Sequence, residues 1–391
     1  MKVTRHRFTN LRFGLLLLLL VFIAAIGVPD TAVATATTSK NYQLISEQST
    51  NSGVVSARED GVELTAAAQP WSMTRMEAAQ PYPLPSVDSI PVAKENLVQP
   101  GAEPVFIPSI PPNNSQPGDP TAGETSIQSG QSTAGYDYPA PYTRFENFDS
   151  YQVFPYSTIG VLFFTQRGTD YRCSAAVVGE NALWTAGHCV HYGSGESEGW
   201  SENVVFVPAY KDGTEPYGRW DYYDLATRVA WYSGGDLRFD IGGVILDPNL
   251  AQQSVQDVVG SLGFAYNLNP NQHWFNIGYP SDSPFDGKTM QICAGSFSRN
   301  ATNVASPMPV GMGCDMTQGS SGGPWIIDFG GPAGGTNYLN GNNSFRYTGF
   351  GEEIYSPSFG DAAKDLLDFI SADTKLRTNI HIPIITSSGD K

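Results

Sequence analysis

A serine between glycines lies in the octet TQGSSGGP at residues 317–324. A nucleophilic hydroxyl must project into a cleft while nearby backbone N–H groups point at the negative charge that develops on an attacked carbonyl oxygen. Glycines permit the tight backbone turns that this geometry needs on both sides of the serine. The octet therefore favours a serine nucleophile at Ser320 or Ser321, with a Ser/Gly-rich surface turn as the structural alternative.

A nucleophilic serine needs a base, and the run LWTAGHC at residues 183–189 offers His188. An apolar strand leads there into a short Ala-Gly turn, and the histidine stands beside a cysteine. The chain has five histidines; the other four are His6, His191, His273 and His381, and they lack this context. We select His188 as the base and expect His191 to be its exposed neighbour.

A base of this kind needs a carboxylate to orient it, and the run FDIGGVIL at residues 239–246 places Asp240 at the start of an apolar strand. Removing a carboxylate from water is costly unless a hydrogen-bond donor meets it. An imidazole N–H is such a donor, and it would be held in one tautomer. Asp236 and Asp247 are the alternatives, but each stands among turn residues and could face water.

Short apolar runs separated by turn residues begin near residue 144, which indicates an all-β fold that would position these side chains. The turn at residues 179–181 predicts a hairpin between two of the runs. Apolar residues at helical spacing predict one helix over 361–370. The expected strands are residues 159–165, 173–178, 182–185, 204–207, 241–246, 275–278, 323–328 and 347–350.

The preceding segments have the composition of export and linker sequences. Basic residues, an apolar run at 13–28 and small residues at 32–36 predict a signal peptide over residues 1–36, with an uncleaved membrane anchor as the alternative. Residues 37–143 are rich in Pro, Ser and Gly, so we predict a disordered pro-segment or linker. The folded domain is expected over residues 144–375, followed by a frayed tail over 376–391.

Four cysteines in an exported chain indicate two disulfides. Three pairings are possible, and we favour the nearest neighbours, Cys173 with Cys189 and Cys293 with Cys314. A metal site is the alternative, but there is no Cys-x-x-Cys and no EF-hand-type loop, so we expect no metal and no other cofactor. The formal net charge of −16 leaves no basis for nucleic-acid binding.

Together these runs resemble the trypsin-like serine peptidases of the chymotrypsin fold. The resemblance rests on the order His…Asp…Ser, on TAGHC at 185–189 and on GSSGGP at 319–324, and it extends from about residue 158 to 370. VPAY at 207–210, PYG at 216–218, IGYP at 277–280 and the TQGSS run resemble the V8-like, glutamyl-endopeptidase-type branch. The resemblance implies two six-stranded antiparallel β-barrels with a C-terminal helix.

The resemblance also implies a role for each matching residue. Ser321, rather than Ser320, would attack the peptide carbonyl, because the Gly-x-Ser-Gly-Gly pattern places the nucleophile second. His188 would accept the hydroxyl proton and later deliver it to the leaving amine. Asp240 would orient His188 and stabilise it when charged. The backbone N–H groups of Gly319 and Ser321 would form the oxyanion hole.

Trypsin-like enzymes that mature through a new N-terminal amine carry an aspartate where this chain has Ser320. We therefore expect activation without that salt bridge, through removal of a pro-segment that uncovers the cleft or frees the fold.

Substrate preference remains open at this stage. Asp315 falls where trypsin has the carboxylate that selects basic residues, whereas the expected pocket wall at 338–344 has no histidine of the kind that accompanies glutamate selectivity. We assign substrate binding to Asp315, Thr317, Asn340 and Gly341.

The resulting hypothesis is a secreted serine endopeptidase, extracellular or periplasmic, made as a zymogen. Its partners would be protein or peptide substrates, and it would be a monomer without stable membrane association once the signal is removed. The alternative is a catalytically silent, trypsin-like binding or adhesion module.

Overall fold

The computed structural model of the chain describes residues 43–44, 53–58, 70–88, 103–113, 138–147, 149–302, 304–330 and 336–378. All of them belong to one of the two units into which the chain divides, Tyr42–Lys391. The predicted signal peptide lies outside the described residues, as does the tail beyond residue 378.

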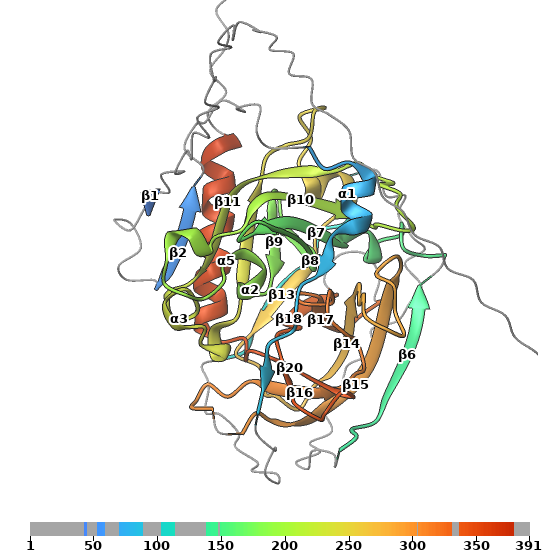
Figure 1. Cartoon of the computed structure of the whole chain (residues 1–391), viewed down its shortest axis with the longest axis vertical. Coiled ribbons are helices and arrows are strands. Elements are labelled where there is room, and N and C mark those ends of the chain that lie inside the picture. The colour runs from blue at the N-terminus through green and yellow to red at the C-terminus, as the bar shows by residue number, and fades with distance from the viewer. Residues whose placement is uncertain are drawn as a thin grey trace, which may run out of the picture. The chain divides into compact units, whose positions relative to one another are not determined.

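The first half of the domain is a closed antiparallel barrel (Figure 1). Its strands pair in the ring β7-β8-β9-β12-β11-β10 and back to β7. The strands are β7 (Ile159–Gln166), β8 (Thr169–Gly179), β9 (Ala182–Thr185), β10 (Glu202–Pro208), β11 (Trp220–Arg228) and β12 (Gly242–Leu246). Between them lie helices α2 (Gly187–Val190) and α3 (Val229–Gly234) and the 3-10 turns Ser197–Gly199 and Leu237–Phe239.

The second half is built on a sheet in the order β20-β16-β15-β14-β17-β18-β13, in which β13 pairs with β18 in parallel. We expected a second closed barrel, but the pairings among the described residues leave β20 at one end of the sheet. The strands are β13 (Gly263–Tyr266), β14 (His273–Gly278), β15 (Met290–Asn300), β16 (Val310–Gly313), β17 (Pro324–Ile327), β18 (Tyr338–Asn342) and β20 (Glu353–Ser356). Helix α4 (Val255–Val259) precedes this half, and α5 (Asp361–Thr378) ends the described chain.

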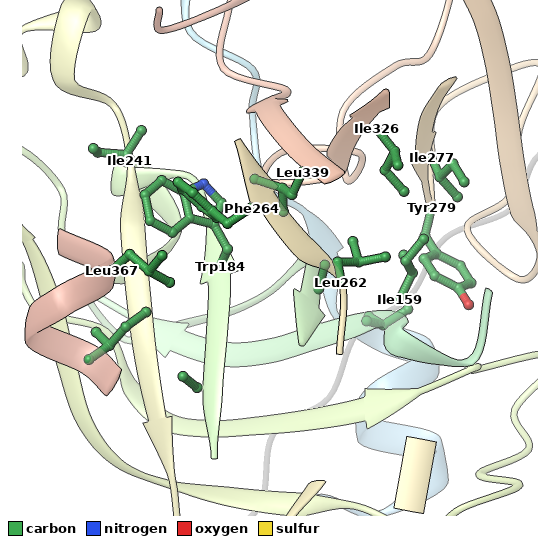
Figure 2. Packing of buried hydrophobic residues seen from close by; sticks show 14 of the residues in the cluster. Ile159, Trp184, Ile241, Leu262, Phe264, Ile277, Tyr279, Ile326, Leu339 and Leu367 are labelled. Carbon is green, nitrogen blue, oxygen red and sulfur yellow. The ribbon is translucent and has the colours of Figure 1, made fainter. Parts of the chain in front are cut away.

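A hydrophobic core joins the two halves (Figure 2). Trp184 of β9 packs edge-to-face on Phe264 of β13, with ring centroids 4.9 Å apart. Leu339 and Ile326 extend the cluster into the second half, and Leu367 of α5 closes it beside Trp184. Burial of these side chains holds the two halves together, so the edges from which the catalytic candidates project keep a fixed relationship.

Several pieces of the Pro-rich N-terminal range pair with the domain, although composition alone predicted an extended or disordered segment. β2 (Val54–Arg58) pairs with β11, β3 (Gln80–Pro81) with β8, β5 (Val105–Ile107) with β13 and β6 (Tyr142–Asn147) with β15. The short strands β1 (Gln43–Leu44) and β4 (Ser86–Val87) and helix α1 (Met73–Ala78) also lie in this range. β4 pairs with the two-residue β19 (Arg346–Tyr347) of the domain, and the 3-10 turn Tyr156–Thr158 precedes β7. Backbone hydrogen bonds to existing strands supply order that the composition of these pieces does not.

Most expected elements of the domain are confirmed, several with longer bounds such as β8 in place of 173–178, and two more differ as follows. The strand expected at 347–350 is the two-residue β19, after which Phe350 N–H donates to Tyr347 O in a turn. The helix expected at 361–370 continues to Thr378. Both predicted disulfides are confirmed, Cys173–Cys189 and Cys293–Cys314. Among the described residues, no helix has the length and apolar character to cross a membrane.

Candidate active site

The imidazole of His188 is held by the carboxylate of Asp240. His188 lies in the short helix α2, directly after β9, and Asp240 lies directly before β12, the strand that pairs with β9. The Nδ1 atom of His188 is 2.8 Å from Oδ2 of Asp240, and its backbone N–H donates to Oδ1 at 2.8 Å. The exposed fractions are 2% for His188 and 0% for Asp240, so water does not compete for this pair.

Further donors satisfy the buried Asp240. The hydroxyl of Ser344 donates to Oδ2 at 2.5 Å, and the side-chain amide of Asn342 donates to the Asp240 carbonyl oxygen at 3.3 Å. Buried carboxylates are costly unless hydrogen-bonded, and this one has three donors on its two oxygens. Ser344 belongs to the pocket wall expected from the sequence, but its bond to Asp240 was not predicted, because the polar NNS run at the end of β18 gives no signal of that contact.

Ser321 lies in a loop that packs on β8 and on the end of β9 in the first barrel. The Ser321 carbonyl oxygen accepts from Ser174 N–H at 2.7 Å. The next residue, Gly322, has φ +76°, and a Cβ there would lie 2.0 Å from Thr185 Oγ1 and 2.4 Å from Ser174 O. Only glycine fits this close approach, which places the serine at the end of β9 from which His188 follows.

The expected hydrogen bond between Ser321 and His188 is not formed in this state of the chain. Ser321 Oγ and His188 Nε2 are both buried, and neither has a hydrogen-bond partner among the described residues. Catalytic hydrogen bonds are often long or misaligned until substrate binds. Both atoms are therefore available for pairing, and the close approach of Gly322 to Thr185, three residues before His188, brings their two segments into contact.

Gly319 also occupies a position that excludes a side chain. Its φ is +89°, and a Cβ would lie 2.6 Å from Ser281 Oγ and 2.9 Å from the Tyr279 carbonyl oxygen. Its N–H donates to the carbonyl oxygen of Tyr82 at 3.4 Å. The proposed oxyanion donor thus already faces a peptide carbonyl of the chain's own N-terminal segment.

The face of the His188 ring is covered by Tyr82. The two rings stack with centroids 5.2 Å apart and an interplanar angle of 22°. Sequence reasoning placed Tyr82 in a linker, because the prolines on both sides of it gave the signal of an unpaired segment. Tyr82 and Leu84 alternate with prolines, and two large apolar side chains two positions apart lie on one face of an extended segment. This spacing was the feature that could have indicated a buried face.

The residues assigned to substrate binding fall into two groups. Asp315 lies before the nucleophile loop, where Arg144 Nη1 approaches its carboxylate to 3.6 Å, and Thr317 exchanges hydrogen bonds with the Asp282 backbone at 3.0 Å. Asn340 and Gly341 lie inside β18. The Asn340 side chain bonds Trp274 and the Ala265 carbonyl oxygen, and Gly341 is opposite Trp325. These contacts are with the sheet.

Arg346 was not selected from the sequence, yet it lies against the same region as Asp315. Its guanidinium donates to the carbonyl oxygens of Cys314 and Met316, the two neighbours of Asp315. Burial lowers the pKa of Arg346 to about 10, and the charge of Asp315 opposes that shift. The partly exposed carboxylate of Asp315 is thus close to Arg144 and feels the charge of Arg346.

His191 is buried, which corrects the expectation that it is exposed. It packs against Trp200 and Tyr232, at centroid distances of 4.8 and 4.3 Å. Its Nδ1 accepts from Gly193 N–H at 2.9 Å, so the proton is on Nε2, which donates to Glu196 O at 2.9 Å. Burial lowers its pKa to about 4. A polar residue next to His188 looked exposed because local sequence does not show which aromatic side chains converge on it.

Comparison with curated proteins finds one partial relative. The chain is 26% identical over 137 residues to a Bacillus subtilis (strain 168) protein named extracellular metalloprotease. The match covers 34% of this chain and 41% of that protein's own length. No protein-family model matches the chain.

That relative's name implies a metal, so the possible ligands among the described side chains are relevant. Two groups bring possible ligand atoms within 4.8 Å of one another: Cys173 with His188 and Cys189, and Cys293 with Cys314 and Asp315. In both groups the two sulfurs are joined in a disulfide. Zinc needs thiolates, imidazoles or carboxylates, at least three from the protein. Each group retains one such residue, so neither fits a metal ion.

Two solved structures are matched over almost their whole length. Protease Anisep from Arthrobacter nicotinovorans is 34% identical, with a TM-score of 0.51, and the match covers 55% of this chain and 96% of that one. The thermostable serine protease AL20 from an extremophilic microorganism is 33% identical, with a TM-score of 0.50, and the match covers 55% of this chain and 97% of that one. With its closed β-barrel, second sheet and terminal helix, the chain belongs to the trypsin-like serine protease family.

Proposed function

We propose that the chain is an exported serine endopeptidase, made as a precursor, that cleaves peptide bonds through an acyl-enzyme on Ser321. The observation that carries the proposal is the buried His188–Asp240 pair, with 2.8 Å between Nδ1 and Oδ2. Asp240 Oδ2 is an acceptor, so the neutral imidazole keeps its proton on Nδ1 and presents Nε2 as the base. The unpartnered hydroxyl of Ser321 is the group that this base would deprotonate.

Each step of the proposed reaction uses a residue placed above. Ser321 Oγ attacks the carbonyl carbon while its proton passes to His188 Nε2, and Asp240 stabilises the imidazolium. The N–H groups of Gly319 and Ser321 receive the oxyanion. The tetrahedral intermediate collapses, and the same proton moves from His188 to the leaving amine. Water then attacks the acyl-enzyme and gives its proton to His188, which returns it to Ser321 Oγ as the carboxylic acid product leaves.

Export is supported by several features of the chain. The chain carries two disulfides, which persist in oxidising compartments. The partial curated relative is named as an extracellular protein. The N-terminal 36 residues have the composition of a signal peptide. A protein in this setting meets protein and peptide substrates directly.

A fluorophosphonate probe tests the nucleophile, because it reacts with activated serines. We expect the secreted, processed protein to be labelled and Ser321→Ala to be unlabelled, with Ser320→Ala as the matched control that keeps labelling. Loss of Ser321 should lower peptide hydrolysis by roughly 10⁴-fold or more. Absence of labelling in correctly processed, folded protein would contradict the proposal and favour a binding module.

The same material can resolve the P1 residue. Cleavage of a mixed peptide library would show whether Asp315 selects basic residues despite its approach to Arg144 and Arg346. We expect Asp315→Asn to alter the cleavage pattern if this carboxylate contacts the P1 side chain, and to leave the pattern unchanged if the two arginines neutralise it.

A further inference from the structure

Residues 80–88, here called the strap, run from the first barrel to the second half of the domain (Figure 1, light blue, leading away from α1). At one end β3 pairs in parallel with β8, through Gln80 and Pro81. At the other end β4 pairs in parallel with β19, and the carbonyl oxygens of Pro85 and Val87 accept from the N–H groups of Arg346 and Thr348 at 3.0 Å. The strap thus connects the two halves between which the candidate site lies.

Tyr82, in the middle of this path, fills an aromatic recess beside the catalytic base. Its ring contacts Tyr171, Phe164 and His188, with centroid distances of 4.9, 5.7 and 5.2 Å. The exposed fraction of Tyr82 is 8%. A side chain this buried beside the imidazole excludes from that space any substrate group that would approach His188.

The phenol of Tyr82 is fastened to the barrel. Its hydroxyl donates to Gln166 Oε1 at 2.6 Å, and Gln166 Nε2 in turn donates to Ser201 Oγ at 3.0 Å and to the His188 carbonyl oxygen at 3.3 Å. Burial, with a further contribution from the nearby Tyr171, raises the pKa of this phenol, so the hydroxyl remains a donor. The Tyr82 hydroxyl and the backbone of His188 therefore belong to one buried hydrogen-bond network.

The backbone of Tyr82 occupies the other half of the catalytic machinery. Its carbonyl oxygen receives the Gly319 N–H at 3.4 Å, the donor expected to hold an oxyanion. The bond after this carbonyl is Tyr82–Pro83, whose nitrogen carries a ring carbon instead of hydrogen. Pro81, Pro83 and Pro85 restrict the strap to extended conformations, which reduces the entropy lost on binding. The strap thus occupies the site, and the peptide bond that it presents after Tyr82 is a bond to proline, which has no N–H.

Beyond the plug, the strap covers apolar surface of the second half. Leu84 packs against the cluster that contains the Cys293–Cys314 disulfide and Met316. Val87 packs against the cluster of Phe345 and Tyr347. The strap therefore packs on two apolar clusters of the second half, one at Leu84 and one at Val87.

Helix α1 anchors the strap on its N-terminal side. Arg75 makes a two-point pair with Asp170, with both N–O distances at 2.7 Å. Arg172 caps the helix C-terminus, donating to the carbonyl oxygens of Met76 and Glu77 at 2.7 and 3.0 Å. Because carbonyls at a helix C-terminus lack intrahelical donors, a guanidinium there stabilises the helix where the strap begins.

We infer that the strap is a built-in inhibitor of the unprocessed chain, with Tyr82 as a plug that occupies the recess beside His188 and the N–H of Gly319. This inference rests on the proposed function, since it gives the pro-segment a defined inhibitory contact. It also defines a binding surface: once the strap leaves, the recess of Phe164, Gln166, Tyr171 and His188 accepts a tyrosine from a proline-spaced peptide.

Labelling of the uncleaved chain by a fluorophosphonate probe tests the plug, because gel mobility separates uncleaved from processed protein. Processed wild type is prepared by limited proteolysis and freed of the released segment by size-exclusion chromatography. We expect the uncleaved wild type to label at least tenfold more slowly than this material. Uncleaved Tyr82→Ala should label at nearly the processed rate, Tyr82→Phe at an intermediate rate, and Tyr138→Ala, which removes a tyrosine packed on Phe350, like wild type.

A peptide of sequence QPYPLPSVD, residues 80–88, tests the same contact on processed wild type, independently of whether Tyr82→Ala folds. We expect the peptide to inhibit hydrolysis at millimolar concentration or below, to survive incubation uncut, and to weaken at least tenfold when its tyrosine is alanine. Equal labelling of uncleaved and processed wild type would contradict the inhibitory role of the strap. A peptide that does not inhibit, or that is readily cut, would contradict it too. Either result would leave the proposed function intact. Absence of labelling in both forms would overturn the proposed function itself.

Discussion

The side-chain amide of Asn343 donates to the carbonyl oxygen of Ser320 at 3.0 Å, directly beside the proposed nucleophile. The Oδ1 atom of Asn343 accepts from Asn276 and Trp325 at 2.6 and 2.8 Å. The Ser320 hydroxyl itself donates to the Thr317 carbonyl oxygen at 2.8 Å. A neutral amide network therefore holds the nucleophile loop at the place where we expected no aspartate–amine salt bridge.

Replacement of Asn343 by alanine should destabilise the domain and slow catalysis. It leaves the buried donors of Asn276 and Trp325 unsatisfied, at about 1–3 kcal/mol each, so we expect a loss of roughly 2–5 kcal/mol in the free energy of unfolding. Urea unfolding measures this change. The exposed Asn269 provides the control, since Asn269→Ala should stay within about 0.5 kcal/mol. Equal effects of the two substitutions would show that the hydrogen bonds of Asn343 do not stabilise the nucleophile loop.

Acid should destabilise the domain through His191. Its pKa is about 4 in the folded chain against an ordinary 6.5, so the unfolded chain takes up the proton first as the pH falls. The associated stability is present above pH 6.5 and is lost progressively as the pH falls to about 4, by at most about 3 kcal/mol. Unfolding free energies of wild type and His191→Gln, measured across this window, should diverge with the variant showing the flatter slope. Parallel curves would be inconsistent with a buried, neutral His191.

Chelators should leave the processed enzyme active. Neither group of possible ligands retains more than one residue outside a disulfide, so removal of divalent metal should not change the rate of casein hydrolysis. A serine-directed fluorophosphonate should abolish it. Loss of activity in EDTA with recovery on addition of zinc would instead show that the activity depends on a metal, as the name of the Bacillus relative implies.

Loosening the anchor of helix α1 should speed labelling of the uncleaved chain without touching the catalytic groups. Arg75→Gln removes the two-point pair with Asp170, which should raise the fraction with an open cleft about tenfold for about 1.4 kcal/mol lost. The labelling rate of the uncleaved band reports this change. Glu77→Gln alters an exposed charge on the same helix and should behave as wild type. A processed enzyme carrying Arg75→Gln in its precursor should be kinetically identical to wild type.

The sequence motifs predicted the local backbone geometry of the candidate site better than the contacts around it. Gly322 illustrates why the motif was informative: its close approach to Thr185 and Ser174 admits no side chain, so the residue type itself reports the geometry. His191 shows the opposite case. Its burial depends on contacts with Trp200 and Tyr232, and no local sequence pattern indicates that these rings pack against it. The pairing of β2, β3, β5 and β6 with the domain likewise depends on partners that composition cannot indicate.

Tyr82 combines both difficulties. Alternating prolines have the composition of an unpaired segment, and the binding partner of the tyrosine is a histidine more than one hundred positions away. The role of Tyr82 can be recognised only from the folded structure, in which β7, β8 and α2 form the recess that its ring fills.

The occupied cleft also determines how activation depends on concentration. A molecule whose own strap covers His188 and the N–H of Gly319 is not expected to make the first cut in the chain that connects strap and domain, so that cut comes from an already open molecule or from another protease. Self-activation would therefore be second order in protein, with a lag that shortens as product accumulates. Dilution after export would prolong latency, and crowding on a substrate surface would end it.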